Sequence, residues 1–142
     1  MNNAFEYKQK MNNYIKFVLM WFLVLGASFV AHYLVLSNDD VGRYWEESEY
    51  SLLGLYSFVG GASLLIMVFV LLAKWSMPER LGVIFLGLMF IKAIASYVYI
   101  QNGLNKFEND FIEYNFLVVF FIFLFFDVFI AFKALNQEDK EV

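Results

Sequence analysis

Two ionisable residues, Lys92 and Asp127, lie inside long apolar stretches of the sequence. Lys92 follows Leu81 by eleven residues, and Asp127 precedes Leu135 by eight. At a rise of 1.5 Å per residue, these offsets put the two residues ~16 Å and ~12 Å from the same end of two antiparallel helices. Ionisable groups surrounded by lipid are candidates for function because no water solvates them. We therefore expect Lys92 and Asp127 to meet near the middle of a membrane.

Three roles fit this pair. The simplest is a structural ion pair, since each unpaired charge would cost about 2.5–3.5 kcal/mol at the centre of a membrane helix. The second is a proton or cation path, although the chain has no third deep carboxylate or histidine to extend a relay. In the third, Asp127 faces a partner protein while Lys92 extends its charge toward the membrane surface.

Two polar residues share the helix face of Lys92. Ser96 and Tyr99 follow it by four and seven residues, so their side chains lie above one another on a helix. They are possible partners of the ammonium group or of a water molecule. Alternatively, Ser96 bonds only to its own backbone, as serine in membrane helices often does.

The composition requires a membrane environment for these residues. Of 142 residues, 61% are hydrophobic and 21% aromatic, whereas soluble domains are roughly 45–50% apolar. About 20 apolar residues cross a bilayer as a helix. We predict an all-α, four-helix bundle that runs up-down-up-down and forms one transmembrane domain over residues 1–142, with spans at 17–36, 52–73, 81–100 and 114–135.

Lys and Arg orient this bundle, because cytoplasmic loops carry an excess of them. Seven of the ten fall on one side and two on the other, with Lys92 inside a span. Both termini should therefore face the cytoplasm, and the acidic segment 37–51 should be a solvated loop outside. A cleaved signal peptide is the alternative for the first span, but its apolar run continues well past Gly26, Ala27 and Ser28.

A stripe of small residues marks the second span. Gly54, Ser57 and Gly61 are spaced three and four residues apart and share one face. Small residues let membrane helices approach closely. We expect the stripe to pack within the bundle, with an oligomer or a foreign helix as the alternative.

Several functions are disfavoured by residues that the chain lacks. It has no Cys, which excludes thiol chemistry and thiolate metal sites, and its net charge of −4 argues against nucleic-acid binding. The lone His32 makes no metal site without further ligands, and a weak cation site with Asp39 and Asp40 is the alternative. We expect no enzyme activity, no cofactor and no metal.

The closing stretch YNFLVVFFIFLFFDVFIAFKALNQ, residues 114–137, resembles a family of uncharacterised four-span proteins from Bacteroidota. The resemblance rests on Tyr-Asn-Phe-Leu at residues 114–117, on the Phe-rich turns that follow and on the acid at Asp127. Members of that family tend to be encoded beside the membrane-sector genes of ATP synthase. The resemblance implies a counterpart of ATP synthase subunit I, whose members are small four-span proteins of the bacterial inner membrane that assist assembly of the rotor ring.

Two functions follow from these observations. The first is an accessory or assembly protein of a larger inner-membrane complex, which contacts other membrane subunits, or itself, through its helices. The second is a small oligomeric transporter or ion-conducting protein that uses Lys92 and Asp127.

Overall fold

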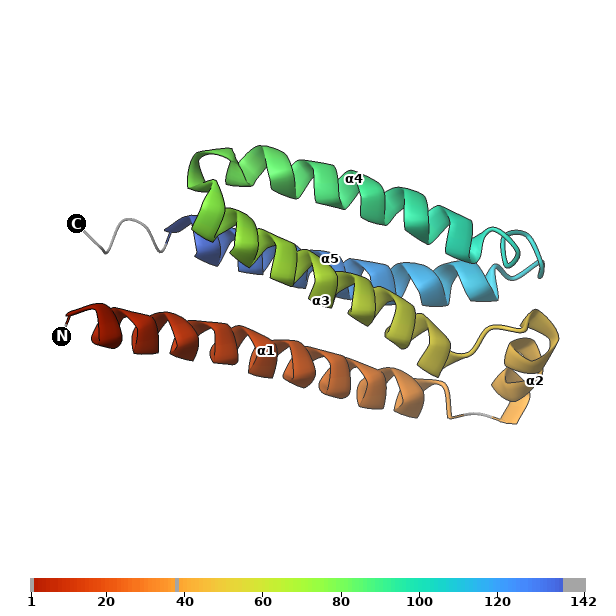
Figure 1. Ribbon diagram of the computed structural model, residues 1–142. Coiled ribbons are helices and arrows are strands. Elements are labelled where there is room, and N and C mark those ends of the chain that lie inside the picture. Colours follow the sequence, from red (N-terminus) through yellow and green to blue (C-terminus); the bar gives the residue numbers. More distant parts are fainter. Residues whose placement is uncertain (1, 38, 137–142) are drawn as a thin grey trace.

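The computed structural model describes residues 2–37 and 39–136 of the chain. All regular structure in these residues is helical. Four helices are long and apolar enough to cross a membrane, so the prediction of a four-span, all-α chain is confirmed in these terms. Successive long helices run in opposite directions, and α1 begins at the end of the bundle where α5 ends (Figure 1). The helices are α1 (Asn2–Val35), α2 (Asp39–Ser48), α3 (Leu52–Ser76), the 3-10 turn η1 (Pro78–Arg80), α4 (Leu81–Ile100) and α5 (Phe111–Asn136).

Local sequence explains where the central helices begin. Ser51 caps α3, because its Oγ accepts a hydrogen bond of 3.0 Å from the backbone nitrogen of Gly54. Pro78 opens η1 directly after α3, at a helical position where its missing N–H is not needed. The connection between α3 and α4 is therefore tight, and the two helices pack side by side.

Two segments differ from the prediction. Helix α1 begins at Asn2 rather than near residue 17, because residues 2–16 contain no Gly or Pro and include several strong helix formers. The acidic segment is not a simple solvated loop, because α2 forms within it and folds over the end of the bundle (Figure 1). Its Tyr44 and Trp45 rings contact Phe107 and Phe111 at centroid distances of 5.0 and 4.9 Å, which anchors α2.

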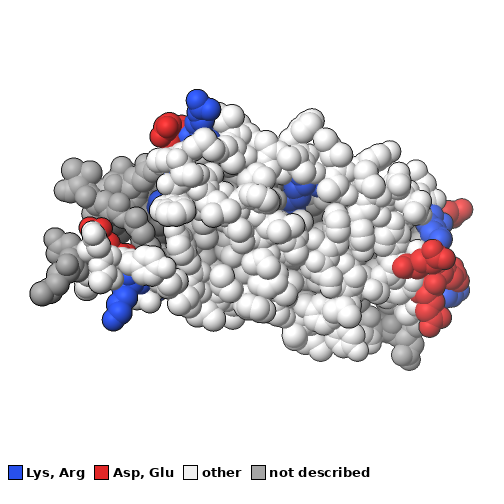
Figure 2. Space-filling model, viewed as in Figure 1, with Lys and Arg blue, Asp and Glu red and all other residues white. Residues whose placement is uncertain are grey.

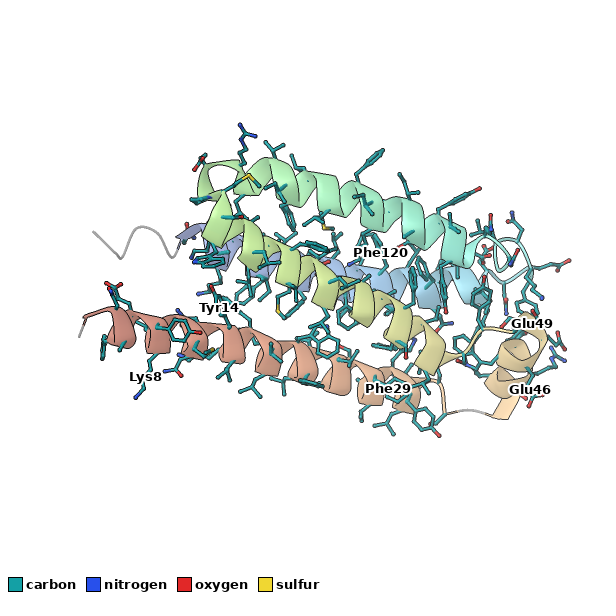
Figure 3. The ribbon with its side chains drawn as sticks, in the orientation of Figure 1. Lys8, Tyr14, Phe29, Glu46, Glu49 and Phe120 are labelled. Carbon is teal, nitrogen blue, oxygen red and sulfur yellow. The ribbon has the colours of Figure 1, made fainter. Side chains whose placement is uncertain are left out.

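Charged side chains gather at the two ends of the molecule. Figure 2 shows a broad uncharged belt between them, interrupted by one small basic patch. Glu46 and Glu49 lie at the α2 end, whereas Lys8 lies at the opposite end (Figure 3). This arrangement is what a lipid bilayer around the belt requires, because charges favour the water on either side.

The helices contribute unequally to the core. Helix α3 is central and packs against α1, α4 and α5. In the most apolar stretch of α3 and of α5, 44% of residues are buried, compared with 17% in α4 and 6% in α1. Helices α3, α4 and α5 thus form a compact frame, and α1 is attached to its side.

Candidate functional site

Lys92 and Asp127 meet inside the bundle, where their side chains form an ion pair. The distance from Lys92 Nζ to Asp127 Oδ2 is 2.5 Å. Both residues are almost completely buried, with 3% of Lys92 and 2% of Asp127 exposed. The two charges are therefore withdrawn from lipid, and each compensates the other.

Three helices position the pair. Lys92 comes from α4, Asp127 from α5, and Ser63 on α3 accepts a hydrogen bond of 3.1 Å from Lys92 Nζ. Phe120 of α5 lies between α4 and α5 (Figure 3), with its ring centroid 5.3 Å from the same nitrogen. The ion pair thus ties together the three helices of the frame.

Ser63 is a member of this site that the sequence interpretation missed. It is fully buried, at 0% exposure, and follows Leu52 by eleven residues. That offset corresponds to ~16 Å of helical rise, which is half of a ~30 Å apolar layer. Matching the depths of polar residues across all spans would have found it.

The predicted neighbours of Lys92 do not bind its ammonium group. Ser96 is buried, but none of the described residues bonds its Oγ, nor the second oxygen of Asp127. The Tyr99 ring stacks on Phe58 at 4.2 Å. Side chains on a helix lean toward its amino terminus, so Lys92 extends toward the end where α4 begins, away from Ser96 and Tyr99. The ammonium group therefore bonds to Asp127 and Ser63, and the possible contact with Ser96 or Tyr99 is not seen among the described residues.

The small-residue stripe on α3 does not face the interior of the bundle along its whole length, as the sequence had led us to expect. A Cβ atom at Gly54 would meet the Tyr99 hydroxyl at 3.4 Å, but Ser57 is exposed, and no described atom lies within 4 Å of a Cβ at Gly61. The stripe as a whole does not pack within the bundle. The close approach is at Gly60, where a Cβ would lie 2.7 Å from Leu25 of α1.

Gly60 is also where α1 bonds to α3 near mid-membrane. Its carbonyl accepts a hydrogen bond of 2.9 Å from Trp21 Nε1. Among the described side chains of α1, only Phe17 and Trp21 are buried. The fully buried contact of α1 with the frame lies in the middle of the helix, and the partly buried Leu25 and Phe29 continue the packing toward the α2 end.

An apolar groove of about 640 Å³ opens beside this contact, between the amino-terminal half of α1 and α3. Tyr14 projects into it from α1 (Figure 3). Its walls are formed mainly by methionine, aromatic and aliphatic side chains. The lining residues are Asn3, Glu6, Tyr7, Met11, Tyr14, Val18, Met67, Val68, Leu71, Leu72 and Trp75.

A second polar cluster surrounds His32, at the α2 end of α1. The imidazole contacts Tyr56 of α3 and Asn115 of α5. Within residues 2–37 and 39–136, no group of three or more His, Cys, Asp or Glu residues is placed to hold a metal ion.

Comparisons with protein-family models, curated proteins and solved structures gave no match for this chain. The functional interpretation therefore rests on the geometry of the candidate sites.

Proposed function

We propose that this protein is an accessory subunit or assembly factor of a larger membrane complex, and that it acts through contacts between helices without chemistry of its own. One observation carries this proposal. Helix α1 diverges from α3 at its amino-terminal half and leaves an apolar groove whose two walls are membrane helices.

The shape of the groove suits another helix. Met11, Tyr14 and Val18 of α1 are spaced three and four residues apart, so they form one continuous face. Met67 and Leu71 form the facing wall on α3. Membrane helices associate through close packing rather than through the hydrophobic effect, and methionine adapts its shape to different partners. A partner helix in the groove would gain packing with both walls.

The ion pair supports this role as a brace. With Ser63, the Lys92–Asp127 pair connects α3, α4 and α5. Such a brace keeps the α3 wall of the groove in place while α1 adjusts to a partner. In this proposal the pair is structural, and the surface that binds lies between α1 and α3.

The proposal also includes the orientation of the chain in the membrane and the identity of the protein that binds in the groove. The Lys and Arg distribution orients the groove end of the bundle, with both termini, toward the cytoplasm. The resemblance of residues 114–137 to ATP synthase-associated proteins makes the membrane sector of ATP synthase in the bacterial inner membrane the first partner to test. A second copy of this chain is the other occupant to distinguish.

One observation favours a second candidate, a transporter that uses the ion pair. The second oxygen of Asp127 and the Oγ of Ser96 are buried without a partner among the described residues. In this function the two atoms would contact a transported cation or proton. Asp127→Asn should then abolish flux in liposomes while leaving assembly of the protein intact.

Site-specific photo-crosslinking tests the first proposal. A photoreactive residue replaces Val68 in the groove, and Leu86, 68% exposed on α4, serves as the control position. The proposal predicts a crosslink to a foreign membrane subunit from position 68 but not from position 86. Crosslinks to lipid alone at both positions would contradict it, and crosslinks between copies of this chain would indicate self-association.

A further inference from the structure

One face of α1 changes from polar to apolar along the helix. Lys8, Asn12 and Lys16 are spaced four residues apart, and Leu19 and Leu23 continue the same face at spacings of three and four residues. All five side chains are exposed, with 61% of Leu19 and 69% of Leu23 accessible. We refer to these five residues as the outward face of α1. Its first half offers ammonium and amide groups that donate hydrogen bonds, whereas its second half is apolar.

The outward face points away from the other helices. Trp21 bonds to α3, and Asn12 precedes it by nine residues, which is roughly 180° around the axis of a helix with about 3.6 residues per turn. Figure 3 shows Lys8 pointing away from the bundle, whereas Tyr14 points toward α3. A lipid molecule can therefore occupy this face without entering the groove between α1 and α3.

The bond between Trp21 and Gly60 gives the depth of this face in the membrane. Gly60 follows Leu52, the first residue of α3, by eight residues, or ~12 Å of helical rise. Lys16 precedes Trp21 by five residues, and Lys8 precedes it by thirteen. Measured from the Leu52 end of a ~30 Å apolar layer, Lys16 lies at ~20 Å and Lys8 at ~32 Å. Lys8 is therefore at the membrane surface where α1 begins, and Lys16 is ~10 Å below that surface.

The polar side chains of this face are directed toward that surface. Side chains on a helix lean toward its amino terminus, which for α1 lies at this surface (Figure 1). Lysine also keeps its methylene groups in apolar surroundings while its ammonium group approaches water. The ammonium group of Lys16 and the amide of Asn12 thus point toward the layer of lipid headgroups. The two leucines of the face remain among the acyl chains.

The charge of this part of α1 favours an anion. Residues 1–36 contain three lysines and a single acid, Glu6, which lines the groove rather than the outward face. Within the described part of the chain, no residue forms an ion pair with Lys8 or Lys16. The phosphate of a phospholipid is the anion that the headgroup layer supplies. Both ammonium groups are available to bind it.

We propose that the outward face of α1 is a binding site for one anionic phospholipid. Its phosphate accepts hydrogen bonds from the ammonium group of Lys16 and the amide of Asn12, and Lys8 contacts the headgroup from the water side. Its acyl chain lies along Leu19 and Leu23. A free phosphate would have to leave water to reach Lys16, whereas a lipid phosphate is held near this depth by its own acyl chains. The site faces away from the groove, so it stands apart from the proposed function.

Native mass spectrometry of the full-length protein in mild detergent tests this site. The probes are phosphatidylglycerol, which is anionic, and phosphatidylcholine with the same acyl chains, which is zwitterionic. Since two lysines near a membrane surface favour an anionic lipid, we expect one phosphatidylglycerol to bind at least about tenfold more tightly than phosphatidylcholine. Equal affinity for the two lipids would overturn the proposal, and so would competition by inorganic phosphate.

Two variants and a matched control locate the site on α1. Lys16→Gln should lower the affinity for phosphatidylglycerol about fivefold, which is the contribution of one lysine near a membrane surface. Asn12→Leu should lower it by a similar factor through the lost hydrogen bond. Lys133→Gln removes the same charge from an exposed position in the last turn of α5, at the same end of the bundle, and should change the affinity less than about twofold. Equal losses in Lys16→Gln and Lys133→Gln would show a diffuse attraction and overturn the site.

A phosphatidylglycerol with a photoreactive group in its acyl chain tests where the chain lies. We expect it to crosslink to residues 17–24 of α1, the segment that contains both leucines of the outward face. Crosslinks confined to α3, α4 or α5 would overturn the proposal.

Discussion

Replacing Lys92 by methionine tests the brace, in which the Lys92–Asp127 pair and Ser63 connect α3, α4 and α5. Methionine has a similar length and no charge, so the substitution removes the ammonium group with little change in packing. It leaves Asp127, which is 2% exposed, without its cationic partner, and Ser63 without the donor that it accepts from. The expected loss is therefore electrostatic.

The magnitude follows from the burial of both groups. Removing one partner of a buried ion pair costs about 3–5 kcal/mol in soluble proteins, and uptake of a proton by the remaining carboxyl limits that cost. We expect Lys92→Met to lower the free energy of unfolding by about 3 kcal/mol, which is roughly 150-fold in the folding equilibrium. Asp127→Leu should cost a similar amount. The double variant Lys92→Met with Asp127→Leu should lose less than either single variant, because no charge remains in the bundle.

The assay is reversible unfolding in mixed micelles, followed by the loss of helical circular dichroism as the denaturing detergent increases. The charge swap Lys92→Asp with Asp127→Lys is a second check, since it restores the pair in the opposite order. If the two single losses simply add in the double variant, Lys92 and Asp127 do not interact and the brace is refuted. Single variants as stable as the parent would refute it as well.

Three further substitutions, two of them paired with a control substitution, test the packing and hydrogen bonds of the bundle in the same unfolding assay, with the wild-type chain as reference. Gly60→Val should cost about 1–3 kcal/mol, because its side chain would overlap neighbours on α1 and α5; Gly61→Val, with open space around it, should change stability by less than about 0.5 kcal/mol. Ser63→Ala should cost about 1–3 kcal/mol by leaving the buried ammonium short of an acceptor, whereas the exposed Ser57→Ala should be neutral. Trp21→Phe should cost about 1 kcal/mol through the lost indole hydrogen bond, and equal stability of this variant would show that the bond contributes nothing.

The spans could be predicted because bilayer thickness constrains helix length directly. Three of the four predicted spans begin within three residues of the corresponding helix. The meeting of Lys92 with Asp127 was accessible for a related reason, since helical rise converts sequence position into depth. Ser63 satisfies the same depth argument, so its position beside the pair could also be predicted from the sequence.

The rotation of a helix about its own axis is harder to predict from sequence than the depth of a residue in the membrane. Gly54, Ser57 and Gly61 share a face, but the buried face of α3 runs through residues such as Val59, Ser63 and Val70. In a membrane both faces of a helix are apolar, so hydrophobicity does not tell the interior face from the lipid face. The prediction therefore placed Ser57 and Gly61 on the interior face of α3, whereas they lie on its outer face.

The divergence of α1 and the His32 cluster depend on contacts between residues distant in sequence. His32 and Asn115 are 83 residues apart and meet only after α1 and α5 have packed. The sequence around either residue does not indicate that the other will contact it. The partial packing of α1 against the frame, and the groove that it leaves, likewise depend on the three-dimensional arrangement.

Purification of the native protein in mild detergent from its source membrane, with mass analysis of what accompanies it, tests the proposed function most directly. The parent chain is compared with Val68→Trp, which fills the groove, and with Leu86→Trp on the lipid face of α4. We predict a foreign membrane subunit in fixed stoichiometry with the parent and with Leu86→Trp, and its loss with Val68→Trp. Recovery of all three as the same homo-oligomer, without a foreign subunit, would contradict the proposal and favour the transporter.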